Sequence, residues 1–198
     1  GQTILPPVKE GPNYEINGQS IDYAAGKSLK KKKKILGLPY PGGPAVEKLA
    51  KQGDPNYVRF PVATLKSRAL DFSFSGLKTA VLYHFKNLSP QAQETHKADI
   101  AASFQKAVSA ALEKNIEQAL VHTGAQTLTL VGGVAQNNTL AASLRKLAEA
   151  NQCAFYAPQP QYCADNAAMI GYVAHLFAEK KRPYARFNLA ANPSLSLV

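Results

Sequence analysis

The most constraining feature of the sequence is an apolar run that ends at two glycines and is followed by a helix-like segment. Residues 126–133, QTLTLVGG, have the composition of a buried strand, and residues 137–150 form an amphipathic segment typical of a helix. A second unit repeats this order, with a strand expected in CAFYAP at 153–158 and a helix at 164–179. Strands that alternate with helices predict a parallel sheet and an α/β fold.

Four further helices are expected in the first two thirds of the chain. Proline and glycine break residues 1–20 into short extended pieces, and residues 54–75 have few helical spacings. Apolar residues recur at helical intervals from Ile100 to Leu120, and this helix should stop near Gly124. The other three expected helices cover residues 21–36, 44–53 and 76–87.

Composition restricts the class of protein without identifying a function. The chain has 198 residues, 45% of them hydrophobic, which is enough for a sizeable core. More than half of its net charge of +10 comes from Lys27 and the run Lys30–Lys34, so a solvated helix face and an RNA-binding surface both remain open. No apolar run approaches the roughly 18 residues of a membrane span, and two cysteines build no disulfide framework. We therefore expect a cytoplasmic protein without membrane association.

The turn after the first of these strands is a candidate ligand site. Because they lack Cβ atoms, Gly132 and Gly133 would let a ligand approach the backbone, and the N-terminus of the next helix attracts phosphate. Asn137 or Asn138 can instead simply cap that helix. The local sequence leaves both interpretations open.

A carboxylate precedes the last predicted helix, in YCADNAAMIG at residues 162–171. Asp165 can cap this helix, or it can lie at the carboxyl edge of the sheet, where α/β folds bind ligands. One carboxylate does not make a metal site, and the four histidines stand apart in the sequence.

A third segment, LDFSFSGLKTAV at residues 70–81, places Phe72 and Phe74 in alternation with serines before a helix. Apolar residues with a period of two indicate a short strand or docking segment, with Ser75 as the expected helix cap. The serines have no partnered base and acid in recognisable spacing, so nucleophilic catalysis is disfavoured.

Four segments together resemble one known family. YPGGPAVEKLAKQGDP, LDFSFSGLKTAV, GGVAQNNTL and YCADNAAMIG occur in the order and approximate spacing of the TsaD family. Its members are tRNA N6-adenosine threonylcarbamoyltransferases, formerly called O-sialoglycoprotein endopeptidases, and the resemblance extends from Gly1 to about Tyr184. It implies a fold of the actin, Hsp70 and sugar-kinase type, with two α/β lobes that close over a nucleotide. It also implies transfer of threonylcarbamoyl from threonylcarbamoyl-AMP to N6 of adenosine 37, in tRNAs that read codons starting with A.

The same resemblance assigns the residues of a nucleotide site. Gly43, Gly132, Gly133 and Asn137 resemble the residues that hold the nucleotide-bearing intermediate, which is threonylcarbamoyl-AMP or an ATP-like nucleotide. Thr3 resembles a remnant of a phosphate-contacting loop. The resemblance therefore predicts that segments far apart in the sequence meet at the glycine turn.

The resemblance also implies a divalent metal, iron or zinc, with Asp165 as its carboxylate ligand. The family supplies two histidine ligands from a motif in its N-terminal lobe, and the chain contains nothing like that motif. We therefore expect the chain to be mainly a C-terminal lobe, inactive on its own, whose partners are tRNA, companion proteins of the pathway and a missing N-terminal lobe. The expected organisation is a lobe junction with an interdomain helix at 1–43, a nucleotide-binding lobe at 44–184 and an irregular tail at 185–198.

Departures from the family pattern favour an alternative function. Where the family has AAGEAFDKVAKLLGL, the chain has AAGKSLKKKKKILGL, so Lys27 and Lys30 replace acidic residues and hydrogen-bond acceptors become donors. Gln136 replaces a small residue before the family asparagine. The alternative is a degenerate or truncated nucleotide-binding module without catalytic activity. The lysine run can also contact tRNA phosphates, in which case binding would weaken with salt.

Overall fold

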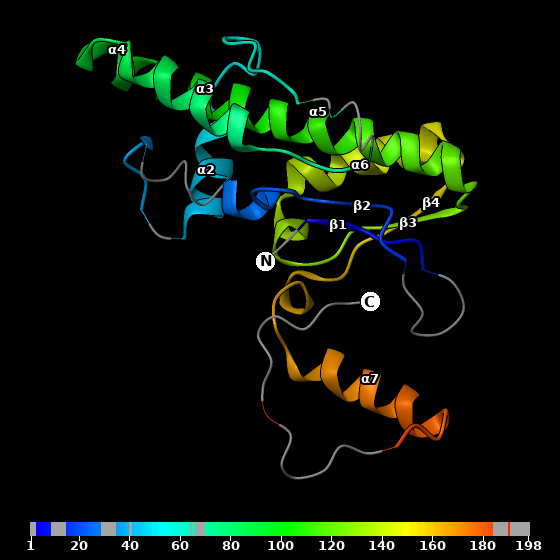
Figure 1. Cartoon of the computed structure of the whole chain (residues 1–198). Helices are drawn as coiled ribbons and strands as arrows, with labels where there is room; N and C mark the ends of the chain where they lie inside the picture. Colours follow the sequence, from blue (N-terminus) through cyan, green and yellow to red (C-terminus); the bar gives the residue numbers. More distant parts are fainter. Residues whose placement is uncertain are drawn as a thin grey trace.

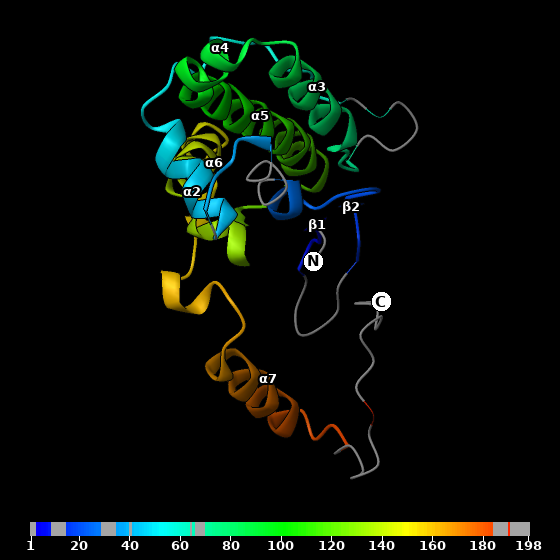
Figure 2. The ribbon, with the colours of Figure 1, turned by 90° about the vertical axis from the view of Figure 1, so that its left-hand side faces the viewer.

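A computed structural model of the chain describes residues 3–8, 15–28, 35–39, 41–63, 65, 70–183 and 190. A long helix, α5 (Lys97–Thr123), lies at the centre, and α2 (Gly42–Ala50) and α6 (Asn138–Ala150) pack beside it (Figure 1 and Figure 2). Helices α3 (Ser75–Lys86) and α4 (Pro90–Thr95) precede α5 in the chain and also contact it.

Two small sheets lie on one side of α5 (Figure 1). The strands β1 (Ile4–Leu5) and β2 (Gly18–Gln19) pair antiparallel. The strands β3 (Thr127–Thr129) and β4 (Ala154–Tyr156) pair parallel, and α6 connects them. The α/β fold and the parallel strand pair predicted from the sequence are therefore confirmed, although both strands are shorter than expected.

Most helices begin and end where the sequence predicts. The helices expected at 44–53, 76–87 and 100–124 correspond to α2, α3 and α5, with ends that differ by up to three residues. Helix α5 ends at Gly124, whose φ of +63° is the left-handed conformation that glycine adopts at helix C-termini. The short helix α4 was not predicted, although Ser89 caps it through the Ala92 N–H.

The helix expected at residues 21–36 begins later than the sequence indicates. Helical backbone starts at residue 25, and residues 29–34 lie outside the described part of the chain. Ile21 is held instead by a hydrogen bond from its N–H to the Phe72 carbonyl at 3.0 Å. Residues 21–24 are therefore not helical, and Ile21 is connected to the segment that precedes α3.

The hydrophobic core forms around α5. Fifteen of its 27 residues are buried, and Phe104 is 0% exposed. Val46 from α2, Val81 from α3 and Leu144 from α6 belong to the same buried cluster. Apolar contacts with three other helices therefore fix α5 in place.

The last helix, α7 (Ala167–Glu179), stands apart from this body in both views (Figure 1 and Figure 2). The 3-10 helix η2 (Pro160–Tyr162) leads to it, and none of the 13 residues of α7 is buried. It begins three residues after the predicted start at 164, because Asn166 caps it. Of the predicted tail at 185–198 only residue 190 is described, so the irregular tail and the three-part organisation stay predictions.

Candidate functional site

The turn between β3 and α6 begins with a glycine that its backbone requires. Gly132 has a φ of +83°, a conformation that other residues rarely adopt, and the 3-10 helix η1 (Gly133–Gln136) follows it. A Cβ atom built at Gly132 or Gly133 would meet no described residue within 4 Å, apart from chain neighbours. At Gly53, by contrast, a Cβ would lie 2.2 Å from the Ala98 carbonyl. Packing therefore explains Gly53, whereas nothing in the described part of the chain explains Gly133.

Asn137 is the N-cap of α6. Its Oδ1 accepts a hydrogen bond from the Leu140 N–H at 2.9 Å, and its Nδ2 donates to Gln105 Oε1 at 3.1 Å. The side chain is buried, so both ends of the amide are used within the protein. The capping interpretation is confirmed for Asn137, and Asn138 is the first helical residue. A direct contact between Asn137 and a nucleotide stays a prediction.

A carboxylate that the sequence did not indicate lies at the same helix start. Glu47 of α2 is buried, and its Oε1 accepts a hydrogen bond from the Asn138 N–H at 3.1 Å. The same oxygen lies 3.3 Å from Lys51 Nζ. Because 91 residues separate Glu47 from Asn138, no local pattern could have found this contact. A carboxylate here neutralises the positive end of α6, so phosphate binding at this helix start is less favourable than the sequence suggested.

Two other predicted site residues are tied to the surroundings of the turn. Thr3 Oγ1 accepts a hydrogen bond from the Ala25 N–H at 2.8 Å. A Cβ built at the next residue, Gly26, would lie 2.9 Å from Cγ2 of Val134, so the segment at residues 25–28 contacts η1. Gly43 lies one turn before Glu47 on α2, and a Cβ built there would likewise meet no described atom within 4 Å.

Asp165 does not take part in these contacts. Its side chain is exposed, and Asn166 rather than Asp165 caps α7, with Oδ1 accepting from the Met169 N–H at 2.9 Å. Of the two interpretations of Asp165, capping of the last helix is therefore wrong. Gln136 Nε2 donates to the Pro160 carbonyl at 3.0 Å, which connects the glycine turn to the segment that carries Asp165. Within the described ranges, no three His, Cys, Asp or Glu side chains gather as a metal site would require.

A different aspartate caps α3. Asp22 accepts hydrogen bonds from the N–H groups of Phe74 and Ser75 and from the Ser73 hydroxyl, which lies 2.6 Å away. Burial by itself raises the pKa of Asp22, but these bonds and one from the Tyr23 N–H together lower the pKa to about 2. Ser75 makes no capping bond, so its predicted role is wrong. With so low a pKa, Asp22 is a poor base for activating Ser73.

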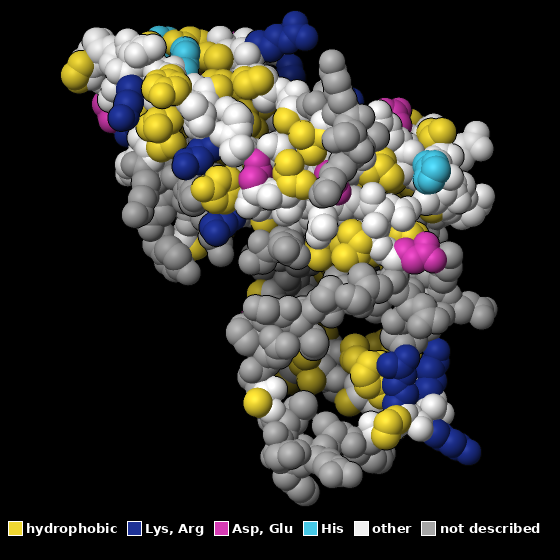
Figure 3. Space-filling model, in the orientation of Figure 1, with side chains coloured by type: hydrophobic (Ala, Val, Ile, Leu, Met, Phe, Trp, Pro, Cys, Tyr) yellow, Lys and Arg dark blue, Asp and Glu magenta, His cyan; other side chains and the backbone are white. Residues whose placement is uncertain are grey.

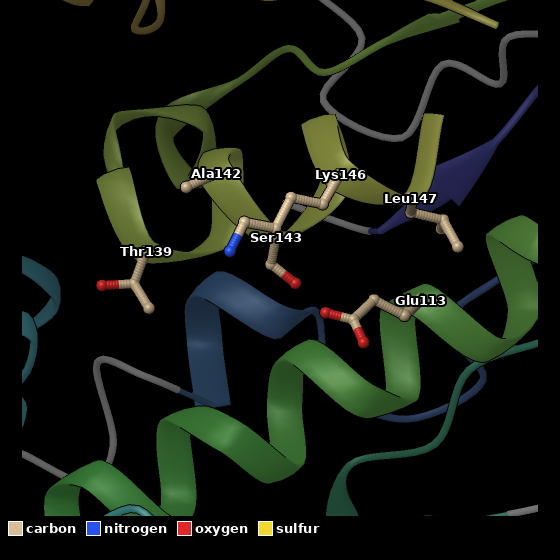
Figure 4. Close-up of a pocket in the computed structure, with 6 residues that line it drawn as sticks. All are labelled: Glu113, Thr139, Ala142, Ser143, Lys146 and Leu147. Atoms are coloured by element: carbon tan, nitrogen blue, oxygen red, sulfur yellow. The ribbon is translucent and has the colours of Figure 1, made fainter. Parts of the chain in front are cut away.

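A surface groove of about 570 Å³ lies between α5 and α6, next to the start of α6 (Figure 4). Glu113 and Lys146 project into it from the two helices, and Thr139 and Ser143 also line it. Burial, together with the neighbouring Glu117 carboxylate, raises the pKa of Glu113. None of the predicted site residues lines this groove, so it is separate from the glycine turn.

The structure describes only some of the residues that depart from the family pattern. Lys27 Nζ lies 5.5 Å from the centre of the Tyr23 ring, so the lysine that replaces an acid makes a cation–π contact near the α3 cap. Lys30 and the rest of the run to Lys34 lie outside the described residues. Cys153 and Cys163 are free cysteines.

These contacts define an α/β protein in which segments from four parts of the sequence meet beside an open glycine turn. The sequence profile of TsaD, tRNA N6-adenosine threonylcarbamoyltransferase, matches residues 1–172. The chain belongs to this family. Each predicted nucleotide-site residue and Asp165 lie within the matched residues.

Curated relatives agree with this family membership. A tRNA N6-adenosine threonylcarbamoyltransferase from Chlorobium phaeobacteroides is 44% identical over 200 residues, covering 96% of the chain and 56% of the relative. The protein of the same name from Moorella thermoacetica is 41% identical over 197 residues, covering 100% of the chain and 57% of the relative. The chain thus spans little more than half the length of these relatives.

A solved structure shows a similar fold. HypF of T. kodakarensis matches with a TM-score of 0.60 at 23% sequence identity, over 85% of the chain and 21% of HypF. At this identity the likeness concerns the fold alone. Separately, no helix in the described ranges has both the length and the apolar character needed to cross a bilayer.

Proposed function

We propose that the chain is the C-terminal, nucleotide-binding lobe of a tRNA N6-adenosine threonylcarbamoyltransferase with an actin-, Hsp70- and sugar-kinase-like fold. The complete protein transfers threonylcarbamoyl from threonylcarbamoyl-AMP to N6 of adenosine 37 in tRNAs that read codons starting with A, in the cytoplasm. One observation carries the proposal: Gly133 lies within the region matched by the family and has no packing reason to be glycine among the described residues.

The proposed site would bind a nucleotide mainly through main-chain groups. The glycines of the turn and Gly43 would leave main-chain N–H and C=O groups accessible to an adenosine and its ribose. The side chains of Asn137 and Thr3 accept hydrogen bonds from the main chain, and they would fix the positions of the segments that surround the nucleotide. Because Glu47 places a carboxylate at the start of α6, the phosphate of threonylcarbamoyl-AMP or of an ATP-like nucleotide is expected on the Thr3 side of the turn.

A divalent metal, iron or zinc, belongs to the proposed enzyme, with Asp165 as one oxygen ligand. The residues of the described ranges do not fit a complete metal site by themselves, because Asp165 has no pair of His, Cys, Asp or Glu neighbours there. The other ligands would come from an N-terminal lobe, which the relatives are long enough to contain. The chain alone is therefore expected to catalyse no transfer, and tRNA and companion proteins of the pathway would bind the assembled enzyme.

Calorimetry with ATP and AMP tests the nucleotide site directly. Gly133→Ala should weaken binding at least tenfold, because the new methyl group would stand between the nucleotide and the backbone. Gly76→Ala on α3 is the matched control, since a Cβ at Gly76 also meets no described atom within 4 Å. Equal affinity of wild type and Gly133→Ala would overturn the proposed site.

A non-catalytic nucleotide-binding module is the second candidate, and one observation favours it. Lys27 stands where the family has an acid, and its ammonium nitrogen lies 5.5 Å from the centre of the Tyr23 ring. A tRNA modification assay on the chain combined with the rest of a relative distinguishes the two functions. Nucleotide binding without any threonylcarbamoyl transfer would select the non-catalytic module.

A further inference from the structure

Two histidine rings and two aromatic rings meet where α3 and α5 contact the segment that follows α2. Tyr57 of this segment stacks on His96 with ring centres 4.4 Å apart, and it lies nearly perpendicular to His84, with ring centres 6.1 Å apart. Phe60 lies 5.8 Å from His84, also nearly perpendicular to it. His84 belongs to α3, and His96 comes directly before α5. Ring packing therefore connects residues 57–60 to both helices.

The His84 ring has a nitrogen that the fold leaves without a partner. Its Nε2 is buried and makes no hydrogen bond with any residue in the described ranges. A neutral imidazole carries a proton on one nitrogen, whereas a charged ring carries one on both, so a charged His84 would bury an N–H without an acceptor. Burial, and after it the charge of His96, lower the pKa of His84. The last turn of α3 favours a positive charge, but water screens that effect at the surface. The packed arrangement therefore requires a neutral His84.

His96 has different surroundings. Its Nδ1 lies 3.0 Å from Asp99 Oδ2 and its side chain is 35% exposed, so a protonated His96 has both a counter-ion and water within reach. The hydrogen bond from the Asp54 N–H and the contact with His96 lower the pKa of Asp99, so this carboxylate keeps its charge in mild acid. A protonated His96 then places a positive charge in the same cluster as His84, where a second charged ring would be repelled.

The cluster borders solvent, and few other charges act on it. Figure 3 shows a histidine side chain among apolar ones at the end of the molecule where α3 and α4 lie. The other charged side chains next to the cluster in the sequence are exposed or bonded to each other, and none has a described bond to the two histidines: Arg59, Lys86, Glu94 and Lys97. Protonation of the two histidines is therefore the main change of charge expected here between neutral pH and mild acid.

The segment is also held to α5 by hydrogen bonds that do not depend on either histidine. The Val58 N–H donates to Ser103 Oγ at 3.1 Å, and Ser103 Oγ donates to the Asp54 carbonyl at 3.3 Å. The ring contacts with α3, by contrast, pass through His84. The contact with α3 is therefore the part of this packing that protonation can open.

We propose that His84 is a pH-sensitive latch, which joins α3 to residues 57–60 while its ring is neutral and releases this contact when the ring is protonated. The segment stays bonded to α5 in both states, so the opening is local. The latch does not depend on the proposed nucleotide site, because none of its residues belongs to that site.

The direction of the pH dependence follows from the folded state. Because the pKa of His84 is lowered from 6.5, the folded protein binds fewer protons than the unfolded chain near that pH. The contribution of the latch to stability is therefore fully present above pH 6.5 and is lost as the pH falls below it, toward the pKa of the folded state.

Hydrogen exchange of the whole chain at about pH 7.5 and about pH 5.5 tests the latch, after correction for the intrinsic pH dependence of amide exchange. In the wild type, acid should lower the protection of α3 about threefold or more relative to that of α5. His84→Phe keeps a ring at this position but cannot titrate, so it should abolish the difference. His175→Phe on α7 is the matched control, since His175 is exposed and has no described contact with the cluster, and it should behave as wild type.

Two further measurements cover the case in which a phenylalanine does not fit at residue 84. His84→Gln, which also cannot titrate, should lose the pH response in the same way. Nuclear magnetic resonance of the wild-type imidazole protons needs no variant, and the His84 ring should titrate at a lower pH than histidine in an unfolded peptide.

Three results would overturn the latch. These are α3 protection in the wild type that does not change with pH, an equal pH response in wild type and in both His84 variants, and an acid-induced loss that is the same in α3 and α5. The last result would mean that acid destabilises the whole fold rather than opening one contact. A His84 ring that titrates above the pH of a free histidine would contradict the proposal as well.

Discussion

Helices α5 and α7 differ in what surrounds them rather than in whether the sequence forms a helix. In α5, 15 of 27 residues are buried although the helix carries many polar side chains, whereas α7 is more uniformly apolar and has no buried residue. Four helices, α2, α3, α4 and α6, contact α5, whereas α7 stands apart from the body (Figure 2). The comparison shows that apolar composition alone does not determine whether a helix is buried. Burial also requires other elements that pack against the helix.

The largest loss of stability is expected when a buried aromatic ring is removed from α5. Phe104→Ala should lower the free energy of unfolding by about 3–5 kcal/mol, because the ring is fully buried and its loss leaves a cavity. Urea unfolding followed by circular dichroism measures the change. A loss below about 1 kcal/mol would contradict the central place of α5 in the core.

The next largest loss of stability is expected from a glycine that packs against α5, and a glycine in α7 provides the contrast. Gly53→Ala should cost about 1–3 kcal/mol, because its Cβ would lie 2.2 Å from the Ala98 carbonyl just inside α5. Gly171→Ala in α7 meets no described atom within 4 Å and replaces a poor helix former, so it should not destabilise the chain. Urea unfolding curves for both variants measure the free energy of unfolding. Equal losses in the two variants would contradict the expected difference between the surroundings of α5 and α7.

A capping aspartate in the body should show a pH dependence that the α7 cap lacks. Asp22→Ala should cost about 1 kcal/mol at neutral pH through loss of the α3 cap. The pKa of Asp22 is lowered from 3.8 to about 2 on folding, so its contribution is present above about pH 4 and is lost as pH falls through 2. Urea midpoints between about pH 6 and pH 2 should therefore converge for wild type and Asp22→Ala.

The matched control for this pH dependence is Asn166→Ala. Asn166 caps α7 with an amide that does not titrate, so its removal should leave the pH profile of global unfolding unchanged. A profile for Asp22→Ala that stays parallel to wild type down to about pH 2 would show that Asp22 does not link folding to protonation.

The smallest expected effect is on α7 itself. Phe177→Ala should change the free energy of unfolding by less than about 0.5 kcal/mol, because the ring is not buried in the chain. Hydrogen exchange should also find the α7 amides far less protected than those of α5. Protection of α7 equal to that of α5 in the isolated chain would mean that the helix is already covered.

Much of the architecture was predictable because its signals are local. Gly124 ends α5 through its own backbone conformation, and Asn137 caps α6 through a bond to a residue three positions away. The β3–α6–β4 unit likewise follows from the order of its apolar segments. The open turn at Gly132 and Gly133 is visible in the sequence for the same reason, since both glycines lie next to each other between a strand and a helix.

Tertiary structure decided the features that connect distant segments. Asp22 rather than Ser75 caps α3 across 52 residues from Phe74, and Glu47 reaches the start of α6 across 91 residues. Hydrogen bonds within a turn are encoded by a few neighbouring residues, whereas contacts between distant side chains depend on how whole elements pack. The sequence by itself therefore determined most of the segments that become helices and strands and the caps made by neighbouring residues, whereas only packing decided which elements are buried and which helix starts are capped by distant carboxylates.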